Sequence, residues 1–215
     1  MSSNSPTTFL TGIDVSHYQG AIQWDEVKAA GYAFAFAKAT EGAGVVDPMF
    51  AANWNGMQRA GILRGAYHFY RAEQNPAAQA EHFVSTVQLA AGDLPPVIDI
   101  EVNDGVVGTP LVSGVQTWLE TVEQQTGVRP MIYTAASFWD AHFPAEFGQY
   151  PLWIAHYGPH ATPLPGGWTT WAFWQYSQSI PAGGVQGAAD HDYFNGQQSD
   201  LLALIAAART PPQTT

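Results

Sequence analysis

A strand–helix unit repeats along residues 9–135, and this repeat constrains the fold more than any other feature of the sequence. Runs of apolar, β-branched and aromatic residues predict strands over residues 9–16, 32–40, 62–70, 97–101 and 130–135. Helices are expected between them, and three begin with a capping residue followed by proline, at residues 47–48, 75–76 and 109–110. The helices are expected to end at or near glycines: Gly31, Gly61, Gly92 and Gly127.

Strands that alternate with helices predict a parallel sheet, and this many units favour a closed barrel over an open sheet. After Ala135 the pattern loosens. Residues 152–157 and 172–177 still resemble strands, but Pro- and Gly-rich connections replace the helices, before a closing helix over residues 200–208. The predicted fold class is α/β: a single-domain, modified (β/α) TIM-like barrel with an irregular C-terminal part.

The expected domain boundaries follow from the same pattern. The barrel should occupy residues 9–208, since a chain of 215 residues suits one domain with a sizeable core. Residues 1–8 are expected to be a disordered N-terminal segment, and residues 209–215 a disordered tail or the stub of a linker.

Two carboxylates interrupt the most apolar of the predicted strands. Asp99 and Glu101 are set among Val97, Ile98 and Ile100, directly after Pro95-Pro96. Residues two apart in a strand share a face, so the two acids should project side by side. Charge there must be solvated, paired or protonated, and one acid can raise the pKa of the other. This is the physics of a general acid beside a charged carboxylate.

Polar residues collect where the predicted strands end, and in a (β/α) barrel those ends form the catalytic rim. Asp14 ends the first strand, and Glu41, His68 and Tyr133 end others. Asp190 is a fourth candidate acid, although its turn-rich surroundings (residues 187–196) favour a turn residue when it is considered alone.

Composition excludes several function classes. The formal net charge is -11 with only seven Lys and Arg, so neither nucleic acid nor an anionic membrane surface is an expected partner. No run approaches the roughly 18 apolar residues of a membrane span, so no membrane insertion is expected. The first eight residues lack the basic and apolar regions of a signal peptide. With no cysteine, there is no disulfide framework or thiol nucleophile.

The sequence motifs do not support a metal site or a serine nucleophile. Residues 190–192 (DHD) with His156 or His160 could form a ligand set, but Gly158-Pro159 breaks any helix between the two histidines. Nothing matches a zincin or calcium-loop motif, and no nucleophile elbow is present. Neither a metal nor another cofactor is therefore expected.

Aromatic residues near the predicted strand ends suggest a sugar as ligand. Phe34, Phe36 and Trp118 are explained by core packing, whereas other rings lie close to the rim. Carboxylates paired with exposed rings suit a carbohydrate, because rings stack on C–H faces and acids cleave the acetal. The rings near the predicted strand ends are Tyr67, Phe69, Tyr133, Trp153, Tyr157, Trp174 and Tyr176.

The ordered motifs resemble glycoside hydrolase family 25, the Chalaropsis-type lysozymes or N-acetylmuramidases. They are residues 12–20 (GIDVSHYQG), 37–42 (AKATEG), 64–69 (RGAYHF), 97–101 (VIDIE), 153–157 (WIAHY), 174–177 (WQYS) and 190–196 (DHDYFNG). The resemblance extends from about residue 12 to residue 204. One position differs, because the family's common Asp-x-Asn ending is Asp190-His191-Asp192 here.

The resemblance implies an enzyme that hydrolyses the β-1,4 bond between N-acetylmuramic acid and N-acetylglucosamine in peptidoglycan. It implies that Glu101 is the general acid and that Asp99 orients or polarises the substrate's acetamido group, or stabilises charge directly. Asp14 and Asp190 would hold the hydrogen bonds and protonation states of the site. The sugar-binding residues that the resemblance implies are Tyr67, Tyr133, Trp153, Tyr157 and Gln175. A monomer acting on the bacterial cell wall, secreted or released on lysis, is expected.

Two alternatives remain open at this stage. One is a chitinase-like glycosidase that cleaves polymers of N-acetylglucosamine, and the other is a catalytically inactive glycan-binding barrel. The presence of all four acids in the sequence argues against the inactive glycan-binding barrel. Retention or inversion at the anomeric carbon is also open, and the short Asp99–Glu101 spacing favours retention assisted by the substrate's acetamido group.

Overall fold

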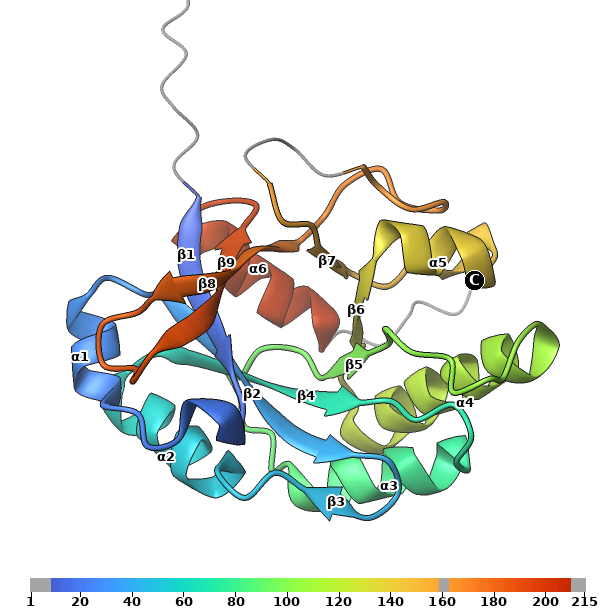
Figure 1. Cartoon of the computed structure of the whole chain (residues 1–215), viewed down its shortest axis with the longest axis horizontal. Coiled ribbons are helices and arrows are strands. Elements are labelled where there is room, and N and C mark those ends of the chain that lie inside the picture. Colours follow the sequence, from blue (N-terminus) through green and yellow to red (C-terminus); the bar gives the residue numbers. More distant parts are fainter. Residues whose placement is uncertain (1–8, 159–162, 210–215) are drawn as a thin grey trace, which may run out of the picture.

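Eight strands close into a barrel in the computed structural model, which describes residues 9–158 and 163–209 (Figure 1). Around the barrel the order is β1-β9-β8-β7-β6-β5-β4-β2, and β2 pairs back with β1. The strands are β1 (Leu10–Val15), β2 (Phe34–Glu41), β4 (Leu63–Phe69), β5 (Val97–Asp99), β6 (Met131–Ala135), β7 (Leu152–Ala155), β8 (Phe173–Pro181) and β9 (Ala188–Phe194). The short strand β3 (Val45–Val46) pairs with β2 outside the barrel.

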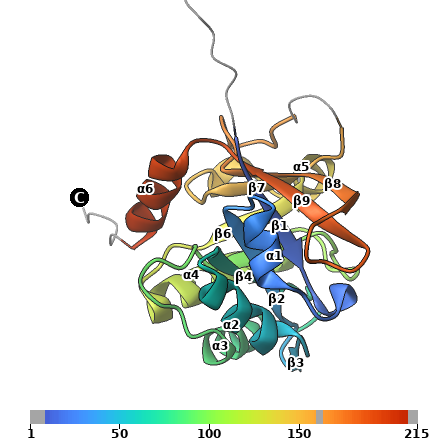
Figure 2. The same ribbon diagram turned by 90° about the vertical axis from the view of Figure 1, so that its left-hand side faces the viewer.

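Helices cover the outside of the barrel and one of its ends. They are α1 (Trp24–Ala29), α2 (Phe50–Ala60), α3 (Pro76–Thr86), α4 (Thr109–Thr126), α5 (Ala136–His142) and α6 (Gln198–Ala208), with 3-10 turns η1 (His17–Gln19) and η2 (Ala145–Phe147). Helix α6 lies apart from α1–α4 at one end of the strands (Figure 2). Among the described residues, none of the helices has the length and apolar character needed to cross a membrane.

Strand alternation divides the buried residues into two clusters. On β2, Phe34 and Phe36 face the barrel interior, whereas Ala35 and Ala37 face the surrounding helices. The interior cluster also contains residues of β5–β9, and Leu201 and Ile205 of α6. Aromatic and aliphatic side chains therefore fill the amino-terminal part of the barrel, and α6 closes it.

Two glycines make room for these rings. A Cβ atom on Gly12 of β1 would lie 2.2 Å from the Phe34 ring, and one on Gly65 of β4 would lie 2.3 Å from the Phe36 ring. Both distances are far below van der Waals contact. These strands therefore need glycine for close packing, because the rings occupy the space that a side chain would fill.

The predicted fold class is confirmed, and so are the strand–helix units up to Ala135. Asn75 caps α3 by accepting a hydrogen bond from the Ala78 N–H, as the cap-and-proline pattern predicts. The expectations for residues 1–8 and 210–215 fall outside the described residues; Arg209, the first residue of the predicted tail, donates a hydrogen bond to the Ala90 carbonyl.

Three predicted boundaries were wrong. Asp47 is not the N-cap of a helix, because α2 begins at Phe50. Its Oδ1 atom accepts a hydrogen bond from the Met49 N–H in the preceding turn, and its Oδ2 atom accepts one from the His17 backbone N–H and contacts His17 Nδ1. Helix α3 ends at Thr86 rather than near Gly92, since Val87 is extended and buried in the outer core. Strand β5 ends at Asp99, so Glu101 lies beyond the ladder.

The last strands depart from the parallel prediction. Strand β9 was missed and runs antiparallel to both β8 and β1. Asp190 is therefore a strand residue rather than a turn residue, paired in register with Asp14. Alternating small, acidic and aromatic residues in 188–194 allow this strand, but the glycines on either side conceal it in the sequence. Helix α5, between β6 and β7, was also missed.

Gly12→Ala should destabilise the fold by about 1–3 kcal/mol, because the Phe34 ring cannot move out of a filled interior. Urea denaturation measures the change. Gly44→Ala is the matched control, since Gly44 is exposed, has no atom within 4 Å of an added Cβ and does not require positive φ. Equal stabilities of the two variants would contradict the packing argument.

Candidate active site

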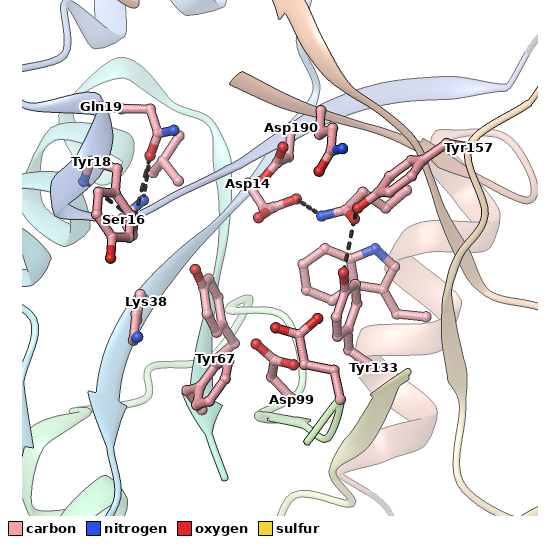
Figure 3. Close-up of a pocket in the computed structure, with 16 residues that line it drawn as sticks. Asp14, Ser16, Tyr18, Gln19, Lys38, Tyr67, Asp99, Tyr133, Tyr157 and Asp190 are labelled. Atoms are coloured by element: carbon pink, nitrogen blue, oxygen red, sulfur yellow. Dashed lines mark hydrogen bonds between the residues drawn. The ribbon is translucent and has the colours of Figure 1, made fainter. Parts of the chain in front are cut away.

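The four candidate acids meet in one pocket of about 250 Å³ at the carboxyl ends of the barrel strands (Figure 3). Asp14 comes from β1, Asp99 from the end of β5 and Asp190 from β9, and Glu101 follows β5 by two residues. Although β5 ends before Glu101, both members of the Asp99–Glu101 pair line the pocket. The structure therefore brings together the four acids that the sequence singled out.

The five predicted sugar-binding residues line the same pocket: Tyr67, Tyr133, Trp153, Tyr157 and Gln175. Gln175 connects two of the tyrosines to one of the acids through hydrogen bonds. Its Oε1 accepts the hydroxyl groups of Tyr133 and Tyr157, each at 2.8 Å, and its Nε2 donates to Asp14 Oδ2 at 2.7 Å. Gln175 therefore fixes two tyrosines and one acid, and half-exposed Tyr157 presents its ring to solvent.

The aromatic interior beneath the acids determines their electrostatics. Asp14 and Asp99 are only 5% and 6% exposed. Burial raises the pKa of Asp14 well above its usual range, and nearby Asp192 and Asp190 raise it further. Burial likewise raises the pKa of Asp99 well above its usual range, and the charge of Glu101 adds to the effect. Both acids therefore favour their protonated forms.

The two more accessible acids are shifted in the same direction. Burial raises the pKa of Asp190 to about 6, against the lowering effect of its hydrogen bond with Asp14. Partial burial raises the pKa of the exposed Glu101, and the positive charge of Lys38 opposes this. The pocket therefore retains protons at a pH where isolated carboxylic acids have lost them.

Lys38 is the one basic side chain among the described residues that line the pocket, and it was not predicted. Its Nζ lies 2.6 Å from Glu41 Oε2 and 4.7 Å from the centre of the Phe69 ring. Lys38 projects inward because it continues the Phe34–Phe36 face of β2. The sequence contained a signal for this orientation, because Lys38 follows Phe36 by two residues and side chains two apart in a strand share a face.

Other pocket residues also escaped prediction: Val15, Ser16, Tyr18, Gln19 and Gln178. Phe69, one of the rings expected near the strand ends, lines the pocket as well. Tyr18 and Gln19 belong to the motif at residues 12–20, whereas Gln178 is on the β8 extension that no pattern indicated. His68 was expected at the rim but is completely buried outside the barrel wall. It contacts Thr40 and Gln79 and stacks on Trp118, and burial lowers its pKa to about 3.

Within residues 9–158 and 163–209, no group of three or more His, Asp and Glu side chains is arranged to hold a metal ion. His160 of the considered ligand set lies outside those ranges. The acids of the pocket instead contact one another, glutamine and rings.

A (β/α) barrel with paired carboxylates and aromatic rings at the carboxyl ends of its strands has the architecture of a glycoside hydrolase. Comparison with known proteins specifies the family. Residues 13–185 match the family model described as "Glycosyl hydrolases family 25". The chain belongs to this family, as its sequence motifs predicted.

Relatives within the family cover nearly the whole chain. Lysozyme M1 of Streptomyces globisporus is 42% identical over 92% of this chain and 72% of its own length. The N,O-diacetylmuramidase of Chalaropsis sp is 30% identical over 91% of this chain and 98% of its own length. The crystal structure of a bacterial lysozyme from Streptomyces coelicolor superposes with a TM-score of 0.87 at 39% identity, covering 94% of this chain and 98% of that one.

The raised pKa values predict that the protein loses stability as pH rises above about 4, the usual value for an aspartate in an unfolded chain. Between that pH and the folded-state pKa, the native state binds more protons than the unfolded chain, so the free energy of unfolding falls with pH. In the Asp190→Asn variant, the free energy of unfolding should decrease less between pH 4 and about pH 6, because the native Asp190 carboxyl, whose pKa is raised to about 6, is absent. Urea titrations from pH 4 to 8 measure both, and a wild-type stability that rises over this range would contradict the prediction.

Proposed function

We propose that this protein is a lysozyme that hydrolyses the β-1,4 bond between N-acetylmuramic acid and N-acetylglucosamine in bacterial peptidoglycan. The observation that carries the proposal is the Asp99–Glu101 pair, which lines an aromatic pocket with Asp14 and Asp190. Membership of family 25 supports it, since relatives of this chain are named lysozyme and N,O-diacetylmuramidase.

Glu101 is the proposed general acid. Glycoside cleavage needs a carboxylic acid that is still protonated when it meets the leaving oxygen. Glu101 is the most accessible of the four acids, and partial burial raises its pKa. Glu101 can therefore reach a bound glycan while its carboxyl group is still protonated.

Asp99 is the proposed partner of the substrate's acetamido group. Its carboxyl is buried, and its Oδ1 atom has no hydrogen-bond partner among the described residues. A substrate N–H bonded to Oδ1 would stabilise the anionic form of Asp99. The proton that the acid pair holds would then favour Glu101, so that substrate binding prepares the donor.

The tyrosines and Trp153 form the proposed sugar-binding wall. Tyr157 offers an exposed ring, whereas Trp153 is nearly buried and stacks on Phe36 at 4.4 Å. We therefore assign direct sugar contact to Tyr157 first. Gln175, whose amide bonds three neighbours, acts mainly by holding Tyr133 and Tyr157 in place.

The proposed place of action is the cell wall, because peptidoglycan lies outside the bacterial membrane. Secretion or release on lysis would both bring the protein there. Because every residue of the proposed machinery belongs to one chain, we propose that the monomer is the active form.

Digestion of purified peptidoglycan, followed by mass spectrometry, tests the proposal. We expect fragments that end in reducing N-acetylmuramic acid. Glu101→Gln should lower kcat by at least about 100-fold, because only the proton donor is lost. Parallel digestion of chitin is the control for substrate class. Faster cleavage of chitin would favour the chitinase-like alternative, and glycan binding without cleavage would favour the inactive barrel.

The stereochemical course gives a separate prediction. We expect retention through the substrate's acetamido oxygen, because Asp99 and Glu101 are separated by one residue and Asp99 is the proposed partner of the acetamido group. NMR of the first-formed product should show the β anomer before mutarotation. An initial α anomer would demonstrate inversion and remove the assisted route.

A further inference from the structure

The pocket is smaller than the polymer that the protein is proposed to cleave. Its volume of about 250 Å³ lies below the roughly 300–1,000 Å³ of pockets that enclose drug-sized ligands. Because a glycan strand contains many sugar rings, the strand must leave the pocket across its rim on each side of the cleaved bond. Side chains on the rim can therefore contact sugars that the acids do not reach.

The rim carries one exposed ring that the proposed mechanism does not use, Tyr18 of η1. With 83% of its surface accessible, Tyr18 is the most exposed of the large hydrophobic side chains in the described part of the chain. Figure 3 shows it on the opposite side of the acids from Tyr157, the half-exposed ring already assigned to sugar contact. A single exposed ring is common on protein surfaces, so its role depends on whether the structure holds it in place.

Local hydrogen bonds fix the turn that carries Tyr18. The Tyr18 N–H donates to Ser16 Oγ at 3.3 Å, and the Ser16 N–H donates to Gln19 Oε1 at 2.9 Å. The turn closes with a hydrogen bond from the Gly20 N–H to the His17 carbonyl at 3.1 Å. Gly20 has a φ of 62°, in the left-handed region that favours glycine. The backbone at Tyr18 is therefore fixed before any ligand binds.

A contact between distant parts of the chain supports the ring itself. Asp47, which directly follows β3 and is 3% exposed, accepts a hydrogen bond through Oδ2 from the His17 N–H at 3.0 Å. The same Oδ2 atom lies 2.7 Å from His17 Nδ1, so both the backbone and the ring of His17 are anchored. The His17 ring lies against the Tyr18 ring, with centroids 4.1 Å apart and planes inclined at 35°. His17 therefore supports one side of Tyr18, and the other side remains open.

We propose that Tyr18 forms an outer sugar subsite, in which its open face stacks on a pyranose ring of the glycan strand beyond the sugars at the acids, and that His17 is the positioning residue that holds the Tyr18 ring. The subsite rests on the proposed function, because only a polymeric glycan extends across the rim. A ring that is fixed before binding loses little conformational freedom, so its contact increases affinity at small entropic cost. A tyrosine ring also offers the flat apolar face that the C–H side of a sugar needs.

NMR titration with peptide-free glycans of alternating N-acetylglucosamine and N-acetylmuramic acid tests the subsite. The parent protein is Glu101→Gln, which should bind these glycans without cleaving them. In this parent, Tyr18→Ala should raise the Kd of an octasaccharide about fivefold or more and change the Kd of the disaccharide less than about twofold. Tyr18→Phe keeps the ring and should match the parent. Leu202→Ala, at an exposed position of α6, is the control for loss of an exposed hydrophobic side chain.

Each other outcome has a definite meaning. An unchanged octasaccharide Kd in Tyr18→Ala would overturn the subsite, and so would an equal loss for both glycans, which would place Tyr18 at the sugars beside the acids. A loss confined to peptide-bearing strands would assign Tyr18 to the peptide instead. If the parent binds neither glycan and the wild-type protein does not cleave peptidoglycan, the proposed function and the subsite both fail. Cleavage by wild type with no effect of Tyr18→Ala removes the subsite alone.

A double-variant cycle tests the positioning role of His17. His17→Ala should raise the octasaccharide Kd by part of the Tyr18→Ala effect. The double variant should bind no more weakly than Tyr18→Ala, because His17 acts through the Tyr18 ring. Losses that add in the double variant would show that His17 acts independently of Tyr18 and would overturn the positioning role. Urea denaturation of the three variants verifies that each one is folded.

Discussion

Burial of several carboxylic acids on top of an aromatic barrel interior is the constraint on which the rest of this structure depends. Because side chains alternate along the barrel strands, Asp99 shares a strand face with Val97, and Asp192 shares one with Phe194. The residue two before Asp14 is Gly12, and the Phe34 ring of β2 occupies the space beside it. Desolvation is the largest contribution to every raised carboxylic pKa in the pocket. The folding of the core and the proton affinity of the site therefore have one physical origin.

The pocket compensates for this burial with very little positive charge. Lys38 lowers the proton affinity of Asp99 and Glu101, whereas Asp14 has only the hydrogen bond from the Gln175 amide to lower its own. Compensation by hydrogen bonds rather than by cations leaves the cluster protonated. An enzyme that needs a general acid gains from this arrangement, since the proton is already present before the substrate binds.

Much of the fold, and the acid pair in the site, could be predicted from local sequence. The strand–helix units, the Asn75 cap and the Asp99–Glu101 pair depend on contacts within a few residues, where propensity and alternation act directly. Strand β9 could not be predicted in this way, because its antiparallel pairing with β1 and β8 joins residues far apart in the chain. Asp190, considered alone, was consequently assigned to a turn.

The sequence by itself determined which residues could share a strand face, and with it the acid pair and the family of the protein. Tertiary structure alone decided which faces meet. Closure of the barrel brings Asp190 and Asp192 beside Asp14, aligns Gln175 with two tyrosines and moves His68 behind the wall. The physical reason is that desolvation and carboxyl–carboxyl contact arise only when distant strands pack together, so proton affinities are properties of the closed barrel rather than of any segment.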